Sequence, residues 1–196
     1  MPENGIIIFA SGKGRNAENI MWHFKSSGDR RVLALLTNNP DAGVIQKAKQ
    51  YGVPVKVFNK KGFYETEDVL NFLLQKNPSL IVLAGFLWLI PEKIIHAFPR
   101  RIINIHPALL PKFGGKGMFG SNVHKQVIES GEKESGITIH YVDELYDAGD
   151  IIFQKKSSVD SADTPQSLAE KIHSLEIKYF PLVIESLLQK KNVDSL

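Results

Sequence analysis

The chain has 196 residues, of which 43% are apolar and 23% are charged. This length and composition are typical of one folded domain and exclude a disordered or fibrous protein. The net charge is only +3 and the basic residues are scattered among acidic ones, so we expect small anionic substrates and no nucleic-acid partner. The chain contains no cysteine. This excludes disulfide bonds, a thiolate nucleophile and a zinc site with cysteine ligands.

The amino terminus enters a short apolar stretch without the basic leader and long apolar segment of a signal peptide. No segment has the run of apolar residues that a membrane span requires. These features predict a cytoplasmic protein that makes no membrane contact. They leave open whether it is a monomer or a homodimer.

Short apolar runs alternate with segments of helical periodicity over the first half of the chain, which is typical of βαβ units and a mainly parallel sheet. We expect strands at 5–10, 32–37, 53–58, 80–84 and 102–105. Helices are expected between them at 17–27, 42–51, 65–76 and 91–98. The unbroken apolar character of these strands indicates that both faces of the sheet are buried.

The second half of the chain has a different pattern. Strands are expected at 137–142 and 151–155, and the connection between them is short enough for an antiparallel pair. A last helix is expected to begin near Pro165 and to bend or restart at Pro181. The sequence thus predicts an α/β fold in a single domain, residues 1–196, with a Rossmann-like open twisted sheet. That sheet is mostly parallel, with an antiparallel carboxyl-terminal portion and helices on both faces.

The segment SGKGRN at 11–16 lies between the first expected strand and the first expected helix. A glycine turn there lets backbone N–H groups approach a phosphate, and the helix adds the positive end of its dipole. The segment lacks the third glycine of the dinucleotide fingerprint and the Gly-Lys-Ser/Thr of a P-loop. Because a tight turn requires glycines for structural reasons alone, both explanations stay open.

The segment NIHP at 104–107 ends a buried strand with two polar residues. Because side chains alternate along a strand, Asn104 and His106 address the same space, at the carboxyl edge where open α/β sheets bind ligands. A histidine can move a proton near neutral pH, and an asparagine amide can donate to a developing oxyanion. The pair suits acyl transfer to an amine.

Each of these residues also has a structural explanation, Asn104 as a strand-end cap and His106 as a buried histidine bonded to backbone. Left unpaired, each would cost about 1–3 kcal/mol, so something must bind them. The loop 143–150 holds four acidic residues and follows a strand that bears His140. It has the composition of a solvated loop, yet Asp147 is well placed to hold His106 protonated through an ion pair.

Two further features carry less weight. The remaining histidines lack metal-ligand spacing, so no metal site is expected. The glycine-rich, cationic segment 112–120 is interpreted as a mobile surface loop, although it would suit an anion.

Taken together, the motifs resemble the phosphoribosylglycinamide formyltransferase family, the folate-dependent formyltransferases of purine synthesis. The resemblance spans the chain and rests on SGKGRN at 11–16, LAGF at 83–86, NIHP at 104–107, LLPK at 109–112, GITIH at 136–140 and DAG at 147–149. It departs from the family pattern at Arg15, where a small hydroxyl residue is usual. The segment 114–122 also looks longer than in many relatives.

The resemblance implies the roles of individual residues. The catalytic residues would be Asn104, His106 and Asp147; the substrate phosphate would be bound by Gly14, Arg15 and Asn16, and the rest of phosphoribosylglycinamide by Pro107 and Glu176. The folate site would comprise Leu87, Trp88, Leu89, Ile90, Asn104, Asp143 and Glu144. The implied co-substrate is 10-formyltetrahydrofolate, and no metal takes part.

Three other kinds of protein compete with this interpretation. Methionyl-tRNA formyltransferases share the asparagine, histidine and aspartate but carry an additional carboxyl-terminal domain, for which 196 residues leave no room. Formyltetrahydrofolate deformylases hydrolyse the same donor and usually carry an amino-terminal regulatory domain. A non-catalytic phosphate- or nucleotide-binding module is the alternative from another class, and it leaves the paired polar residues of the strand unexplained.

Overall fold

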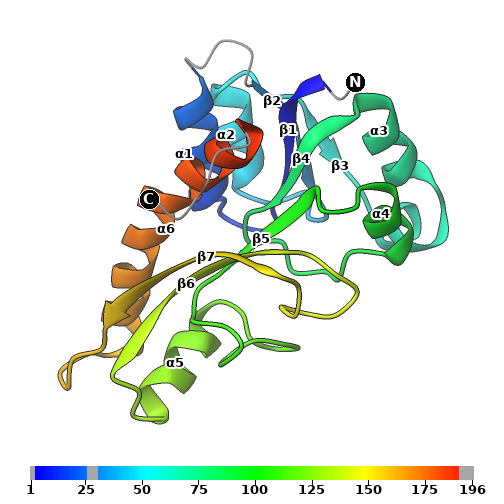
Figure 1. The fold of residues 1–196 in the computed structure, drawn as a ribbon. Helices are drawn as coiled ribbons and strands as arrows, with labels where there is room; N and C mark the ends of the chain where they lie inside the picture. The colour runs from blue at the N-terminus through cyan, green and yellow to red at the C-terminus, as the bar shows by residue number, and fades with distance from the viewer. Residues whose placement is uncertain (1–2, 26–30, 190–196) are drawn as a thin grey trace. The chain divides into compact units, whose positions relative to one another are not determined.

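The computed structural model of the chain describes residues 3–25 and 31–189 (Figure 1). It divides into two compact units, residues 1–103 and 104–196. The boundary falls inside strand β5 (Ile102–His106), so the expectation of a single domain remains a prediction.

Parallel strands form the centre of the first unit. Their order is β3 (Val55–Val57), β2 (Arg31–Thr37), β1 (Glu3–Phe9) and β4 (Pro78–Leu83), with all neighbours parallel. The start of β5 continues this order beside β4, where the Ile81 N–H donates to the Arg101 carbonyl at 2.7 Å. Successive β1 residues from Ile6 to Phe9 are all buried, so both faces of this central strand are covered, as predicted. The prediction was wrong for β3 at the edge of the sheet, where Val57 is 47% exposed.

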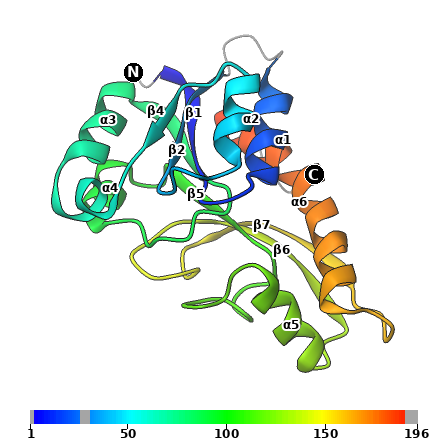
Figure 2. The same cartoon turned by 180° about the vertical axis from the view of Figure 1, so that it is seen from behind.

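Helices cover the strands of the first unit on two sides. Figures 1 and 2 show α1 (Arg15–Phe24) and α2 (Val44–Gln50) on one side, and α3 (Asp68–Lys76) and α4 (Glu92–Ala97) on the other. All four were expected, although the predicted end of the first at residue 27 lies outside the described residues. A short π-helical turn, η1 (Lys61–Glu65), was not predicted.

The second unit contains the antiparallel strands. The end of β5 lies next to β6 (Glu134–Tyr141), which pairs antiparallel with β7 (Ile151–Ser158), as predicted. Helix α6 (Pro165–Leu188) packs against both strands and against α5 (Ser121–Glu129). The α/β class, with mostly parallel strands and an antiparallel end, is therefore confirmed.

Two features of the second unit differ from the sequence analysis. Helix α6 continues through Pro181, which excludes a restart there, because the turns on both sides of the proline bury Tyr179, Phe180, Val183 and Ile184 and hold the helix in place. Helix α5 was not predicted, since only Val123, Val127 and Ile128 give it apolar residues and a glycine-rich segment precedes it.

Candidate active site

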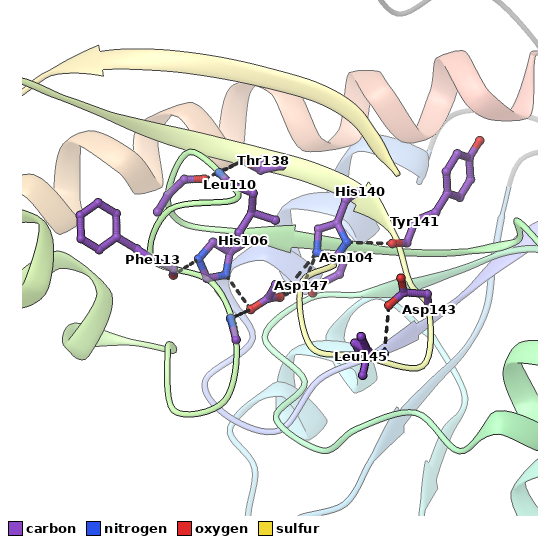
Figure 3. A network of polar contacts seen from close by, with 12 residues as sticks. Asn104, His106, Leu110, Phe113, Thr138, His140, Tyr141, Asp143, Leu145 and Asp147 are labelled. Atoms are coloured by element: carbon purple, nitrogen blue, oxygen red, sulfur yellow. Dashed lines mark hydrogen bonds and ion pairs between the residues drawn. The ribbon is translucent and has the colours of Figure 1, made fainter. Parts of the chain in front are cut away.

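Strand β5 delivers two polar side chains to one face, as alternation predicts. Asn104 Nδ2 donates to Asp147 Oδ1 at 3.4 Å, and His106 Nδ1 lies 3.5 Å from Asp147 Oδ2 (Figure 3). The intervening Ile105 is buried in the apolar core, and His106 is only 3% exposed. The structure thus brings together the three residues that the sequence predicted to be catalytic.

Asp147 is presented by the loop between β6 and β7 in an unusual conformation. Its φ is 56°, a left-handed value that costs a non-glycine residue energy and that persists only where surrounding contacts enforce it. The Gly115 N–H donates to Asp147 Oδ2 at 3.0 Å, and Asp143 Oδ1 accepts from the Leu145 N–H at 3.0 Å within the loop. At Gly149 any side chain would collide with the Tyr141 carbonyl, so the return of the loop requires glycine.

His140 is a member of the site that sequence reasoning did not assign. Its Nδ1 lies 2.8 Å from the Tyr141 carbonyl, and its Nε2 lies 3.2 Å from Asn104 Nδ2 and 3.6 Å from Asp147 Oδ1 (Figure 3). The amide hydrogens of Asn104 therefore point at His140 and Asp147, and its Oδ1 is the atom that can accept from a substrate amine. Donation to an oxyanion requires one of these two bonds to break. The signal for His140 was its position in the GITIH motif.

His106 is held by acceptors at both ring nitrogens. Its Nε2 lies 2.7 Å from the Phe113 carbonyl, a distance that requires an N–H on that nitrogen, so Nδ1 is the nitrogen that gains or loses a proton toward Asp147. Burial lowers the pKa of His106, and Asp147 and the Phe113 carbonyl only partly oppose this. The expectation that an ion pair holds His106 protonated is thus corrected: burial outweighs the carboxylate.

Asp147 is ionised in this environment. Burial acts to raise its pKa, but the interactions with His140, with His106 and with the Gly115 N–H together lower the pKa of Asp147 below its ordinary value. A carboxylate that stays charged beside a buried imidazole can stabilise the imidazolium that forms when the imidazole takes up a proton. The pair can therefore carry one mobile proton, as general acid–base catalysis requires.

Thr138 fixes the chain that follows β5. Its buried hydroxyl donates to the Ala108 carbonyl at 2.7 Å and accepts from the Leu110 N–H at 3.0 Å and from Gln154 Nε2 at 2.9 Å. Thr138 lies two residues before His140 on β6 and therefore on the same face of that strand. The same face of β6 therefore contacts the segment after His106 through Thr138 and the Asn104 amide through His140.

The predicted phosphate-binding residues lie in the first unit, at the start of α1. Gly14 is the residue before the helix and has a φ of 68°; a side chain there would collide with Val44. Arg15 and Asn16 form the first turn, where backbone N–H groups and the helix dipole favour an anion. The turn is tied to the segment after β4, because Ser11 Oγ accepts from the Leu87 N–H at 3.2 Å.

The predicted folate-binding segment 87–90 is held by an aromatic cluster. The ring centroid of Trp88 lies 5.9–6.4 Å from those of four neighbours, Phe58, Phe63, Tyr64 and Phe86. Tyr64 also donates through its hydroxyl to the Leu89 carbonyl at 3.0 Å, and Ile90 is buried whereas Leu87 is 48% exposed. The segment therefore has a fixed backbone and one exposed apolar side chain.

The other predicted binding residues belong to the second unit. Pro107 directly follows β5, and Glu176 lies on α6 with its Oε2 3.0 Å from His173 Nδ1. Asp143 is partly buried, and Glu144 is exposed in the loop that carries Asp147.

Neither a metal cluster nor a membrane span is present in the described part of the chain. Within residues 3–25 and 31–189, no three His, Asp or Glu side chains come together in a way that could hold a metal ion. Of the helices in those same residues, none combines the length and the apolar character that crossing a bilayer requires.

Comparison with known proteins places this fold and site in one class. The family model described as formyl transferase matches residues 4–184. The chain therefore belongs to the formyl transferase family.

Its relatives in that family share one name. The phosphoribosylglycinamide formyltransferase of Bacillus subtilis is 37% identical over 190 residues, which cover 94% of this chain and 95% of that protein. The chloroplastic enzymes of that name from Arabidopsis thaliana and Vigna unguiculata are 39% and 41% identical, and the chain spans 66% and 62% of their lengths. The crystal structure of the Bacillus halodurans enzyme superimposes with a TM-score of 0.84 at 35% identity, over 95% of this chain and 96% of that one.

Proposed function

We propose that this protein transfers the formyl group of 10-formyltetrahydrofolate to the amine of 5-phosphoribosylglycinamide, a step of de novo purine (IMP) biosynthesis. The observation that carries the proposal is the cluster of Asn104, His106 and Asp147 at the end of β5, in a chain similar over nearly its whole length to phosphoribosylglycinamide formyltransferase of Bacillus subtilis.

The chemistry follows from the properties of these three residues. The amine nitrogen attacks the formyl carbon and forms a C–N bond, and the negative charge that develops on the formyl oxygen is stabilised by the Nε2–H of His106, which must leave the Phe113 carbonyl to reach it. The proton lost by the amine passes through the Asp147–His106 pair to the departing folate nitrogen as its bond to the formyl carbon breaks. Asn104 orients the amine through its Oδ1, because its N–H groups face His140 and Asp147.

The two substrates are bound by separate groups of residues. Gly14, Arg15 and Asn16 bind the substrate phosphate at the α1 amino terminus, with the Arg15 guanidinium in place of the hydroxyl that is usual in the family. Pro107 and Glu176 contact the rest of phosphoribosylglycinamide. The folate is bound by Leu87, Trp88, Leu89 and Ile90, by Asp143 and Glu144, and by Asn104, which reaches both substrates.

We also propose which molecules take part in the reaction and where it takes place. Both substrates are small molecules, 10-formyltetrahydrofolate is a co-substrate, and no metal takes part. We place the enzyme in the cytoplasm, which the absence of cysteine and the ordinary globular composition support, and we expect either a monomer or a homodimer.

The direct test is an assay of the purified protein with 10-formyltetrahydrofolate, run with and without phosphoribosylglycinamide. We expect release of tetrahydrofolate and formylation of the acceptor only when the acceptor is present. Release at the same rate without the acceptor would identify a hydrolase, and no release in either assay would leave only binding.

A further inference from the structure

The short π-helical turn η1 is a feature of the first unit that the proposed mechanism does not use. Turns of this kind are rare and are frequently found at functional sites. Two neighbouring aromatic residues of η1 have different surroundings: Phe63 is completely buried, whereas Tyr64 is 41% exposed. The exposed tyrosine nonetheless makes directed contacts with a distant part of the chain, so the turn has a candidate role.

Tyr64 contacts the segment 87–90 in two ways. Its hydroxyl donates to the Leu89 carbonyl at 3.0 Å, and its ring centroid lies 5.9 Å from that of Trp88, with the ring planes 31° apart. The segment lies between β4 and α4 and has neither helical nor strand structure of its own. Its backbone therefore depends on side chains such as Tyr64 for its hydrogen bonds.

Lys93 on α4 holds η1 in place for this contact. Its ammonium group donates to the Thr66 carbonyl at 2.6 Å, to Glu67 Oε1 at 3.2 Å and to the Tyr64 carbonyl at 3.4 Å. Because α4 follows the segment 87–90 almost directly, these contacts form a closed circuit. The segment leads into α4, Lys93 of α4 binds the end of η1, and Tyr64 of η1 binds the segment.

The bond to the Leu89 carbonyl sets the orientation of one peptide group. This peptide is planar and trans, so the Leu89 carbonyl and the Ile90 N–H point in opposite directions. Since the carbonyl is directed at the Tyr64 hydroxyl, the Ile90 N–H is directed away from it. A ligand that binds this segment through its backbone therefore meets an N–H whose direction depends on Tyr64.

We propose that Tyr64 is a positioning residue for the folate co-substrate, which orients the Leu89–Ile90 peptide through its hydroxyl, and that Lys93 holds Tyr64 in place. The inference rests on the proposed function, in which the segment 87–90 binds the folate. It adds two residues outside that segment that set the affinity for the formyl donor.

Tyr64→Phe tests the proposal, because it removes the hydroxyl and keeps the ring beside Trp88. We expect the KM for 10-formyltetrahydrofolate to rise about fivefold, the effect of one lost hydrogen bond. The KM for phosphoribosylglycinamide and kcat should change by less than about twofold, since neither depends on this peptide group. Tyr51→Phe, at the end of α2, is the matched control and should behave as wild type, because the contact of its ring with Lys25 does not require the hydroxyl.

Lys93→Met tests whether Lys93 acts through Tyr64. It should raise the KM for 10-formyltetrahydrofolate about twofold, in the same direction as Tyr64→Phe. The double variant should have the KM of Tyr64→Phe alone, because the two residues act through one chain of contacts. Effects that multiply in the double variant would overturn the role proposed for Lys93.

Binding can also be measured without turnover, through the fluorescence of Trp88. The chain has two tryptophans, and Trp22→Phe replaces the one on α1, which is 66% exposed, so that Trp88 remains as the single reporter. In this background, titration with tetrahydrofolate should give a Kd about fivefold higher when Tyr64→Phe is added. This Kd separates positioning of the folate from an effect on the chemical step.

Unchanged values of the folate KM and of this Kd in Tyr64→Phe would overturn the proposal. An equal rise in the KM values of both substrates would also overturn it, because a general loss of structure affects both substrates. A melting temperature for each variant shows whether it is folded, and Lys93→Met provides the test if Tyr64→Phe is not.

The same measurements distinguish failure of this inference from failure of the proposed function. If the wild type formylates phosphoribosylglycinamide and Tyr64→Phe matches it in both folate constants, only the role of Tyr64 is wrong. If the wild type binds tetrahydrofolate but formylates nothing, the proposed function is wrong and the Kd values still decide the role of Tyr64. If it does not bind tetrahydrofolate at all, both are wrong.

Discussion

The two units of the chain use their interiors differently. The first buries successive apolar residues along its strands and an aromatic cluster around Trp88, and its proposed binding segments act largely through backbone, at the Gly14 turn and at residues 87–90. The second buries polar side chains, including His106, Thr138 and His140. In the proposed reaction the first unit therefore supplies backbone for binding, whereas the second supplies the side chains that react.

This difference has an energetic consequence. A buried hydrocarbon contributes stability on its own, whereas a buried imidazole or hydroxyl is tolerated only while its hydrogen-bond partners are present. The second unit should therefore tolerate the loss of a hydrogen-bond partner poorly.

The largest effect is expected for His106, the histidine that we propose to be catalytic. His106→Ala should lower kcat about a thousandfold, because it removes both the oxyanion contact and the mobile proton. Steady-state kinetics with saturating substrates measure this effect, and His96→Ala on the exposed face of α4 is the control. If kcat of His106→Ala stayed within a few-fold of wild type, His106 would not take part in the reaction.

The next prediction concerns the backbone of the turn before α1 in the first unit. Gly14→Ala should destabilise the protein by about 2–4 kcal/mol, because it combines a left-handed φ with a collision against Val44. Gly12→Ala, in the same turn, is the matched control, since no described atom lies within 4 Å of a Cβ placed there. Urea unfolding of both variants gives the comparison, and equal midpoints would show that Gly14 is not needed for the turn.

A smaller effect tests the buried polar network of the second unit. Thr138→Val should cost about 1–3 kcal/mol, because the Leu110 N–H and the Ala108 carbonyl lose their partner and the Gln154 amide keeps only the Leu110 carbonyl. Ser135→Ala on the same strand is the control, since the buried Ser135 hydroxyl has no hydrogen-bond partner among the described residues. We expect that variant to be as stable as wild type, and an equal loss in both would contradict the network account.

The smallest effect is the pH dependence of stability. Folding lowers the pKa values of His106 and His124, so below the ordinary histidine pKa of 6.5 the unfolded chain binds more protons than the folded one. The free energy of unfolding should therefore be largest above pH 6.5 and fall as the pH is lowered to 5. Urea unfolding at several pH values measures this, and His106→Asn should flatten the slope. Stability that increases on acidification would contradict the direction of both shifts.

The sequence predicted what depends on local pattern. Apolar runs located the strands of both units, and alternation along 102–106 placed Asn104 and His106 on one face. The glycine turn before α1 followed from the same kind of local argument. These features need only neighbouring residues, so a single sequence contains their signal.

Contacts between distant segments and backbone groups could not be predicted in this way. The Phe113 carbonyl that binds His106 has no side-chain signature, and His140 meets Asn104 only because β6 lies beside β5. The left-handed φ of Asp147 depends on contacts from Gly115, in a segment interpreted from sequence as a mobile surface loop. The pKa of His106 depends on burial, which the motif alone does not reveal.

In the proposed mechanism Asp147, charged and held beside His106, is required for formyl transfer. This role is tested by kcat for Asp147→Asn, measured with the melting temperature of the same sample, because the amide keeps the size of the side chain and removes its charge. We expect kcat to fall at least about a hundredfold while the protein stays folded. A folded Asp147→Asn variant that formylates phosphoribosylglycinamide at the wild-type rate would contradict it.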